Sequence, residues 1–290
     1  MNYINDFLEY LKVVKKYSYN TNSYYKDILE LYNIFNKDII NINEEKVNKY
    51  LTYLYGKELN KNTISRKLSS IRTFYNYLYN KNIIESNYFL DIKNPKKSKN
   101  LPHYLTNDEI DKLFTISNND NPLTQRNILI IEMLYATGIR VSELINIKIK
   151  DIDRYNNSIK ILGKGNKERI VYYGSYCKDS LDIYLNNGRN ILNKKSSEYL
   201  FLNKNGNKIT DRMIRNILDD LEIKSGGSTH IYPHMIRHTF ATDMLNSGAD
   251  LMTVKELLGH ENINTTSIYT HVTDEQIRKV YDNCHPRAKE

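Results

Sequence analysis

The chain has 290 residues, a hydrophobic fraction of 40% and a formal net charge of +8, with a sequence pI of about 9.1. This length can hold two domains. We find no run of 18 apolar residues and no basic, apolar leader at the start, so we expect neither a membrane span nor a signal peptide. Cys177 and Cys284 are far apart and lack metal-ligand spacing, which predicts reduced thiols in a cytoplasmic protein.

The basic excess is concentrated in the first third of the chain. Residues 1–100 hold 17 Lys and Arg against 10 Asp and Glu, whereas residues 101–290 hold 25 against 24. A local surplus of cations favours a polyanionic partner such as a nucleic acid. An ordinary solvated surface explains the charge equally well when the charge is considered alone.

Four amphipathic helices are predicted in residues 1–92, because apolar residues recur there with the helical period. Asn43 is placed to cap the third of them, and the fourth is expected to begin near Thr63. The outward face of the fourth helix carries three cations that could contact a DNA backbone or groove: Arg66, Lys67 and Arg72. The alternative is that these cations are simply the solvated side of a helix.

A basic linker is predicted at residues 93–104, where the segment 93–101 (KNPKKSKNL) has no apolar period. Its cations are further DNA-binding candidates, because flexible lysines can lie across phosphates; they are Lys96, Lys97 and Lys99. An ordinary soluble hinge would have the same composition. The next domain, residues 105–290, opens with a capping box from Thr106 to Glu109.

A helix over about residues 123–137 is apolar nearly all round, so we expect it to be buried. Gly138 is predicted to end it. Arg140 then lies in the tight turn that opens the next helix, where backbone N–H groups bind phosphate readily. The alternative is a surface arginine paired with Glu143, which we consider weaker because the glycine turn fixes the position of Arg140.

Residues 158–173 are predicted to form a β-hairpin, with Lys164 between Gly163 and Gly165 at its tip. The sequence around these glycines is not a nucleotide-binding loop, since no G-x-x-x-x-G-K-[ST] is present. A lysine on a hairpin tip can be lowered onto a ligand, although turn lysines are common. Residues 175–195 and 210–222 look helical, so the expected fold is mainly α with a small β-hairpin.

The stretch 233–272 is predicted to hold three short helices, over 233–247, over 251–258 and from about residue 264. His234 and Arg237 share a helix face, His260 directly follows the helix-stopping Gly259, and Tyr269 belongs to the third helix. Two histidines, an arginine and a tyrosine that can converge predict a site that holds an anion and attacks it. The apolar residues on the other faces of the first helix are expected to pack inward: Ile236, Phe240 and Leu245.

Several of these blocks resemble the catalytic domain of tyrosine recombinases, the phage integrase family, and most of all its bacterial Xer-type members. They are residues 136–144 (ATGIRVSEL), 163–169 (GKGNKER), 233–272 and the tail 285–288 (HPRA). Together they span most of residues 105–290 and are highly specific. The first 95 residues match the family only in kind.

The resemblance implies strand cleavage by Tyr269, which would form a 3′-phosphotyrosyl bond while a 5′-hydroxyl leaves. Arg140 and Arg237 would clamp the phosphate, and Lys164 would protonate the leaving oxygen. His234 would act as acid or base for the tyrosine, and His260 would hydrogen-bond a phosphate oxygen. No ATP is expected, because the covalent linkage keeps the energy of the phosphodiester bond. No metal or other cofactor is expected either, because no acidic cluster with metal-ligand spacing accompanies these residues.

The resemblance also implies double-stranded DNA with specific inverted half-sites as the partner, and a tetramer on two such sites. Residues 1–92 would clamp the duplex, and the terminal segment would dock on a neighbouring protomer. An Xer-type role in resolving chromosome or plasmid dimers is favoured by the two-domain length. Integration or excision of a mobile element, a type IB-like topoisomerase and an inactive DNA-binding regulator are the alternatives. A second recombinase or a DNA translocase as partner is left open.

Overall fold

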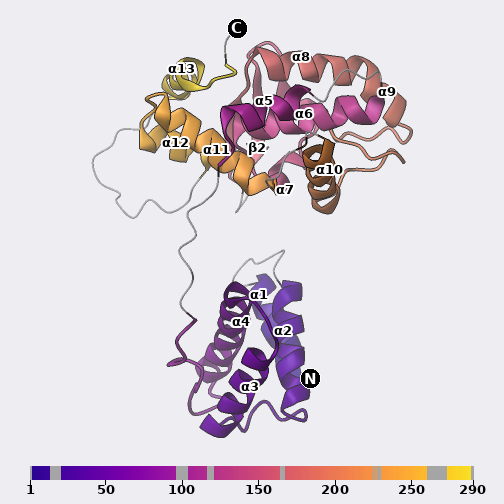
Figure 1. The fold of residues 1–290 in the computed structure, drawn as a ribbon. Helices are drawn as coiled ribbons and strands as arrows, with labels where there is room; N and C mark the ends of the chain where they lie inside the picture. Colours follow the sequence, from indigo (N-terminus) through magenta and orange to yellow (C-terminus); the bar gives the residue numbers. More distant parts are fainter. Residues whose placement is uncertain are drawn as a thin grey trace. The chain divides into compact units, whose positions relative to one another are not determined.

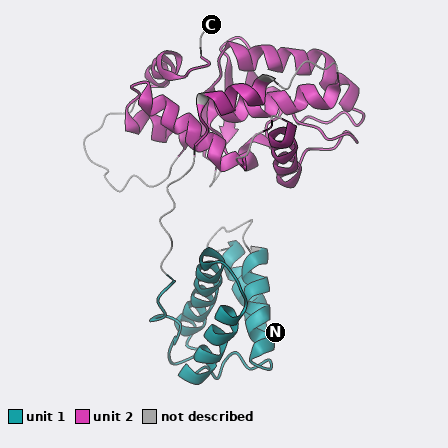
Figure 2. Cartoon of the chain, viewed as in Figure 1, with its two compact units in different colours: residues 1–100 teal, residues 101–290 magenta. Residues whose placement is uncertain are grey.

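The computed structural model describes residues 2–13, 21–95, 104–115, 121–163, 167–224, 226, 230–259 and 273–288. The chain divides into two compact units, Met1–Asn100 and Leu101–Glu290 (Figure 2). Among the described residues, no helix combines the length and the apolar character that a membrane crossing requires. Cys177 and Cys284 are both free thiols.

The first unit contains the four predicted helices (Figure 1): α1 (Asn2–Val13), α2 (Thr21–Ile34), α3 (Glu44–Gly56) and α4 (Lys61–Asn80). Asn43 caps α3 as expected, accepting a hydrogen bond from the backbone N–H of Lys46 at 2.9 Å. Helix α4 begins two residues earlier than predicted, because Asn60 caps it by accepting from the Thr63 N–H at 2.7 Å. The apolar stripes of the four helices meet in one core.

The second unit is mainly helical, and its helices are α5 (Asn107–Thr115), α6 (Pro122–Thr137), α7 (Val141–Leu144), α8 (Ser175–Ile183), α9 (Arg189–Leu192), α10 (Asp211–Lys224), α11 (Pro233–Asn246), α12 (Leu251–Leu258) and α13 (Asp274–Cys284). The described part of this unit also contains a 3₁₀ turn, η1 (Ile149–Asp151), and a π-helical turn, η3 (Tyr184–Gly188). Helices α11, α12 and α13 lie at one end of the unit, and α8, α9 and α10 at the other (Figure 1).

A three-stranded antiparallel sheet in the order β1-β2-β3 accompanies these helices. Strands β2 (Ser158–Leu162) and β3 (Glu168–Tyr172) form the predicted hairpin, with Ile161 paired to Arg169. Strand β1 (Ile152–Asp153) was not predicted, because two residues are too few to show an alternating pattern. The predicted fold class, mainly α with a small sheet, is confirmed.

Helix α6 is the buried centre of the second unit. Every residue from Leu129 to Thr137 is buried, as the all-round apolar pattern predicted. Gly138 then takes the left-handed conformation (φ 59°) that ends the helix. Two buried charges on α6 have partners, since Arg126 donates to the Leu202 carbonyl at 2.9 Å and Glu132 pairs with Arg287.

A smaller apolar cluster joins α11, α12, α13 and the end of β3. Phe240 and Ile236 point inward as predicted, but the prediction for Leu245 is wrong, because its side chain is 40% exposed while the neighbouring Met244 is fully buried. Helix α12 has the predicted bounds and ends at Gly259, again in the left-handed conformation (φ 64°). The cluster fixes the direction in which the chain reaches Gly259.

Candidate active site

Arg140 occupies extended backbone immediately before α7 and contacts Glu143 twice. Its backbone N–H donates to Oε2 of Glu143 at 2.8 Å, and its Nη1 donates to Oε1 at 2.9 Å. Its Nη2 donates to the carbonyl of Gly259 at 3.2 Å. The pairing with Glu143 that was considered as an alternative is therefore present. It leaves 35% of the Arg140 side chain exposed, so this arginine is still partly accessible to solvent.

Glu143 is buried and is shared between two arginines. Arg169, in β3, donates from Nη1 to Oε1 at 3.0 Å and from Nη2 to Oε2 at 2.9 Å. Burial alone would raise the pKa of the Glu143 carboxyl, but the hydrogen bonds from Arg169 and from the Arg140 backbone, with both positive charges, hold that pKa below its usual range. The carboxylate is therefore ionised and can orient both guanidinium groups.

Arg237 is the most deeply buried cation of this group. Its Nη1 donates to the Gly138 carbonyl and its Nη2 to the Leu258 carbonyl, each at 2.6 Å. Burial, followed by the positive charge of Arg140, lowers the pKa of Arg237 to about 10, so the guanidinium stays charged at neutral pH. The ends of α6 and α12 thus supply the acceptors that keep a buried cation in place.

The last carbonyls of α12 each accept a hydrogen bond from a different arginine. Leu257 accepts from Nε of Arg169 at 3.2 Å, and the next two carbonyls accept from Arg237 and Arg140. Terminal carbonyls of a helix have no partner within the helix and carry partial negative charge. Cations from the start of α7, from β3 and from α11 are therefore gathered at one helix end.

Arg169 was not among the residues predicted for this site. A signal for it was present, because Arg169 is two residues before the buried Val171 and thus on the inward side of β3. A charged residue on the inward face of a strand requires a partner. Its identity, Glu143, could not be predicted, since the pairing depends on the tertiary fold.

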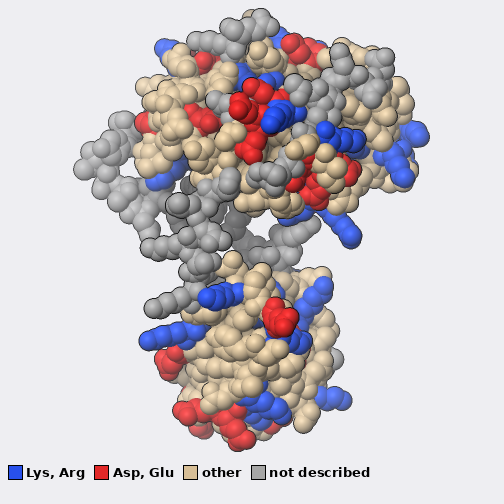
Figure 3. Space-filling model, in the orientation of Figure 1, with Lys and Arg blue, Asp and Glu red and all other residues tan. Residues whose placement is uncertain are grey.

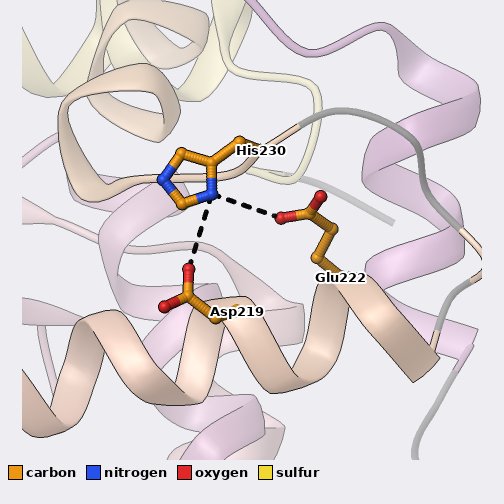
Figure 4. Close-up of side chains that lie close together, drawn as sticks. All are labelled: Asp219, Glu222 and His230. Atoms are coloured by element: carbon orange, nitrogen blue, oxygen red, sulfur yellow. Dashed lines mark ion pairs between the residues drawn. The ribbon is translucent and has the colours of Figure 1, made fainter.

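His234 lies exposed in the first turn of α11, three residues before the buried Arg237. The segment that precedes α11 is held by α10, because Glu222 accepts a hydrogen bond from the Ile231 N–H at 3.1 Å. His230 Nδ1 lies 3.5 Å from a carboxylate oxygen of Asp219 and 3.6 Å from one of Glu222 (Figure 4). The side chain of His230 is 72% exposed, so we interpret this group as an exposed ion-pair cluster that anchors the start of α11.

Three of the predicted catalytic residues, Lys164, His260 and Tyr269, lie outside the described residues. The same is true of the linker candidates Lys96, Lys97 and Lys99. The described neighbours of Lys164 form the base of the hairpin, where the N–H of Gly163 donates to the Lys167 carbonyl at 2.8 Å. Of the predicted catalytic residues that are described, the structure brings Arg140 and Arg237 to the end of α12 and places His234 one turn before Arg237.

The three DNA-binding candidates on α4 all have intramolecular partners. Arg66 pairs with Asp27 at 2.6 Å while 48% of its side chain stays exposed, and Lys67 pairs with Asp27 and with Glu30. Arg72 donates to the carbonyls of Phe89 at 3.1 Å and Ile92 at 2.7 Å. On the face drawn in Figure 3, basic side chains of both units are interspersed with acidic ones. A DNA-binding role for these cations stays a prediction.

The terminal segment packs against its own unit. Arg287 pairs with the buried Glu132 and lies over the rings of Phe114 and Tyr176 at 4.0 and 4.1 Å. His285 is buried, with its ring stacked on Tyr281 at a centroid distance of 5.1 Å. Docking of this segment on a neighbouring protomer is therefore a prediction for an assembly, and in the single chain the segment contributes to the core.

The chain matches two parts of one family. Residues 103–276 match the phage integrase family, and residues 4–82 match the phage integrase N-terminal SAM-like domain. The chain therefore belongs to the phage integrase family. It is 45% identical to tyrosine recombinase XerC of Staphylococcus saprophyticus over 98% of this chain and 97% of that protein. It is a tyrosine site-specific recombinase of the Xer type, as the sequence motifs predicted.

Another relative and two solved structures agree with this assignment. Tyrosine recombinase XerC of Oceanobacillus iheyensis is 44% identical over 99% of this chain and 96% of that protein. The XerA recombinase crystal structure is 29% identical, covers 99% of this chain and 100% of its own, and has a TM-score of 0.51. The structure of the XerH recombinase bound to its difH substrate is 26% identical, covers 91% of this chain and 78% of its own, and has a TM-score of 0.68.

Proposed function

We propose that this recombinase exchanges strands between two DNA sites through a 3′-phosphotyrosyl intermediate with Tyr269 as nucleophile. The phenolic oxygen attacks the scissile phosphorus, and the bond from phosphorus to the 5′-oxygen breaks. His234 takes the phenolic proton, Lys164 gives a proton to the leaving 5′-oxygen, and His260 hydrogen-bonds a phosphate oxygen. A 5′-hydroxyl from the other duplex then reverses the step, which needs no metal ion or ATP.

The convergence of Arg140 and Arg237 on the end of α12 carries this proposal. Each Nη of an arginine has two N–H groups, and Arg237 uses one from each Nη on a carbonyl. The remaining donors can bind the non-bridging oxygens on which charge gathers in the five-coordinate transition state. The same helix end leads directly to His260, so the phosphate clamp and the segment that carries Tyr269 share one support.

The proposed substrate is double-stranded DNA with inverted half-sites, bound by a tetramer on two such sites. The first unit would clamp the duplex with Arg66 and Lys67, while Arg72 holds the carbonyls of Phe89 and Ile92. The lysines of the linker would cross the phosphates: Lys96, Lys97 and Lys99. Full-length similarity to XerC proteins favours dimer resolution of chromosomes or plasmids, in the cytoplasm, over integration of a mobile element. Footprinting on candidate sites would define the half-sites and show whether a second recombinase is needed.

Tyr269→Phe tests the nucleophile. We expect this variant to bind a half-site normally but to form no covalent adduct on a nicked suicide substrate. Tyr281→Phe is the matched control, because Tyr281 is fully buried and its hydroxyl cannot reach DNA in this conformation. The control should form adduct at the normal rate. Adduct formation by Tyr269→Phe would show that the assigned nucleophile is wrong.

The terminal segment is proposed to dock on a neighbouring protomer during assembly on DNA. Deleting it is an unsuitable test, because Ile277 and Tyr281 belong to the core of their own unit. Arg287→Met keeps α13 and removes the ion pair with Glu132. We expect this variant to bind one half-site normally while its cooperative binding to paired half-sites changes; unchanged cooperativity would contradict the docking.

A further inference from the structure

Arg169 joins three segments that the proposed reaction brings together: the hairpin strand β3, Glu143 in α7 and the last turn of α12. We propose that Arg169 is a positioning residue for strand cleavage, which holds Glu143 so that Arg140 faces the phosphate. The inference rests on the proposed function, because it takes Arg140 as one half of the phosphate clamp.

The first step of the argument is the environment of the Glu143 carboxylate. Each of its oxygens accepts one hydrogen bond from Arg140 and one from Arg169, at 2.8 to 3.0 Å. A buried carboxylate with four donors has one favoured orientation. Without Arg169 two of these donors are lost, and the carboxylate can rotate together with the exposed guanidinium of Arg140.

The second step is the fit of the Arg169 side chain beside α12. Gly259 has φ 64°, and a Cβ built on it would lie 3.1 Å from Cζ of Arg169. On the other side, a Cβ on Gly163 would lie 3.5 Å from Nη1 of Arg169. The guanidinium thus occupies a passage between two glycines, and its Nε–H reaches the Leu257 carbonyl. The passage fixes where α12 ends relative to the hairpin.

The third step separates Arg169 from the clamp itself. Both Nη atoms of Arg169 are directed at Glu143, and 15% of its side chain is exposed against 35% for Arg140. Arg140 is therefore the more accessible of the two arginines, and Arg169 contacts it only through Glu143. A lysine cannot replace this support, because one ammonium group cannot form the two parallel bonds of a guanidinium.

The experiment is single-turnover cleavage of a nicked suicide substrate at saturating DNA by the full-length Arg169→Lys variant. We expect the cleavage rate to fall by roughly 10- to 100-fold, since small misplacements of a catalytic group cost about this much. Half-site affinity should stay within about two-fold of wild type, because the bound phosphate still meets both clamp arginines. A purely structural defect would lower affinity and rate together.

A double-mutant cycle with Arg140→Lys tests whether Arg169 acts through Arg140. If it does, the double variant should cleave no more slowly than Arg140→Lys alone. A double variant whose losses multiply would overturn the inference, as would an Arg169→Lys rate within about two-fold of wild type. If Arg140→Lys itself cleaves normally, the clamp is wrong and the proposed function fails instead.

Arg189→Lys is the matched control. Arg189 is also buried and also donates to backbone carbonyls, those of Ser197 and Tyr199, but it contacts none of the residues of the clamp. Its variant should lose stability and keep the normal cleavage rate. If Arg169→Lys does not fold, Glu143→Gln replaces it in the cycle, because it removes the charge that both arginines share. Additive losses in that cycle would overturn the inference equally.

Discussion

The carbonyl of Gly138 accepts a hydrogen bond from Nη1 of Arg237 at 2.6 Å across 99 residues of sequence. Gly138 ends the buried helix α6, and Arg237 lies in α11, so this bond ties the centre of the unit to the proposed clamp. The other Nη of Arg237 ties the same point to the end of α12. The proposed clamp therefore places a role in stability and a role in cleavage on the same residue.

Arg237→Lys should impair both properties. One ammonium cannot reach both carbonyls, and a buried carbonyl without a donor costs about 1–3 kcal/mol, so we expect a loss of about 2 kcal/mol in the free energy of unfolding. The cleavage rate should fall by roughly 100-fold or more, on the scale of losing a transition-state donor. Urea unfolding and single-turnover cleavage measure the two effects. Arg215 forms an exposed pair with Asp211, so Arg215→Lys is the control and should change neither the unfolding free energy nor the cleavage rate. A normal cleavage rate for Arg237→Lys would refute the clamp.

Gly138→Ala should destabilise the second unit more than Gly248→Ala does. Both glycines have positive φ, 59° and 93°, so alanine is strained at either position by about 1–2 kcal/mol. At Gly138 the new Cβ would also lie 2.5 Å from Cδ1 of the fully buried Phe240, whereas nothing lies within 4 Å at Gly248. We expect the clash to add roughly 1–3 kcal/mol, measured as the difference in unfolding free energy between the variants. Equal losses would show that Phe240 moves aside freely.

His285 should make the second unit less stable in mild acid. Burial, only partly offset by the bond to the Tyr135 carbonyl, lowers the pKa of His285 to about 4, and its Nδ1 accepts from the Arg287 N–H at 3.1 Å, so the neutral ring is required. The unfolded chain binds a proton near pH 6.5, so this stabilisation is complete above 6.5 and is lost as pH falls towards 4. The loss is roughly 2 kcal/mol between pH 6.5 and 5.

The measurement for His285 is the unfolding free energy of wild type minus that of His285→Gln at several pH values. The difference is needed because burial raises the pKa of Glu132 to about 7, against the opposing effect of Arg287. Glu132 therefore adds stability as pH falls from 7 and partly masks the histidine. A wild-type-minus-variant difference that does not shrink between pH 6.5 and 5 would refute the role assigned to His285.

Arg66 and Arg72 should differ in how they affect binding of DNA. Each phosphate contact adds about 0.9 to the slope of log affinity against log salt concentration. Arg66 is half exposed beside Asp27, so Arg66→Gln should reduce this slope by about 0.9, the value of one phosphate contact. Arg72 is engaged by the carbonyls of Phe89 and Ile92, so Arg72→Gln should lower stability and leave the slope unchanged. Half-site binding over a salt series measures the slope for both variants, and equal slope changes would contradict the distinction.

Helix ends were predictable from the sequence because their chemistry is local. A side chain such as Asn43 can cap only a few residues away, and the left-handed turns at Gly138 and Gly259 need a residue without a Cβ. The apolar periods likewise revealed which helix faces are buried. These signals established the four helices of the first unit and the order of α6, the hairpin, α11 and α12.

The rest depends on contacts between distant residues. The partner of Arg66 and Lys67 is Asp27, about 40 positions earlier in the chain, and no periodic pattern reveals such a pair. The helical segment expected over residues 175–195 contains the π-helical turn η3. The sequence did not reveal this turn, because a shift in backbone hydrogen bonding leaves the apolar spacing nearly unchanged. For Arg169 the inward position on β3 was visible in the sequence, but its partner Glu143, like Asp27, is determined by the fold.

The three arginines at the end of α12 also restrict how the protein can be altered. Inserting or deleting one residue in this eight-residue helix would rotate its terminal carbonyls by about 100°, and each guanidinium would then meet the wrong oxygen or none. The first unit does not share this constraint, because its core is separate from α12. The length of α12 is therefore a constraint in its own right, because only that length brings its last carbonyls to the three guanidinium groups.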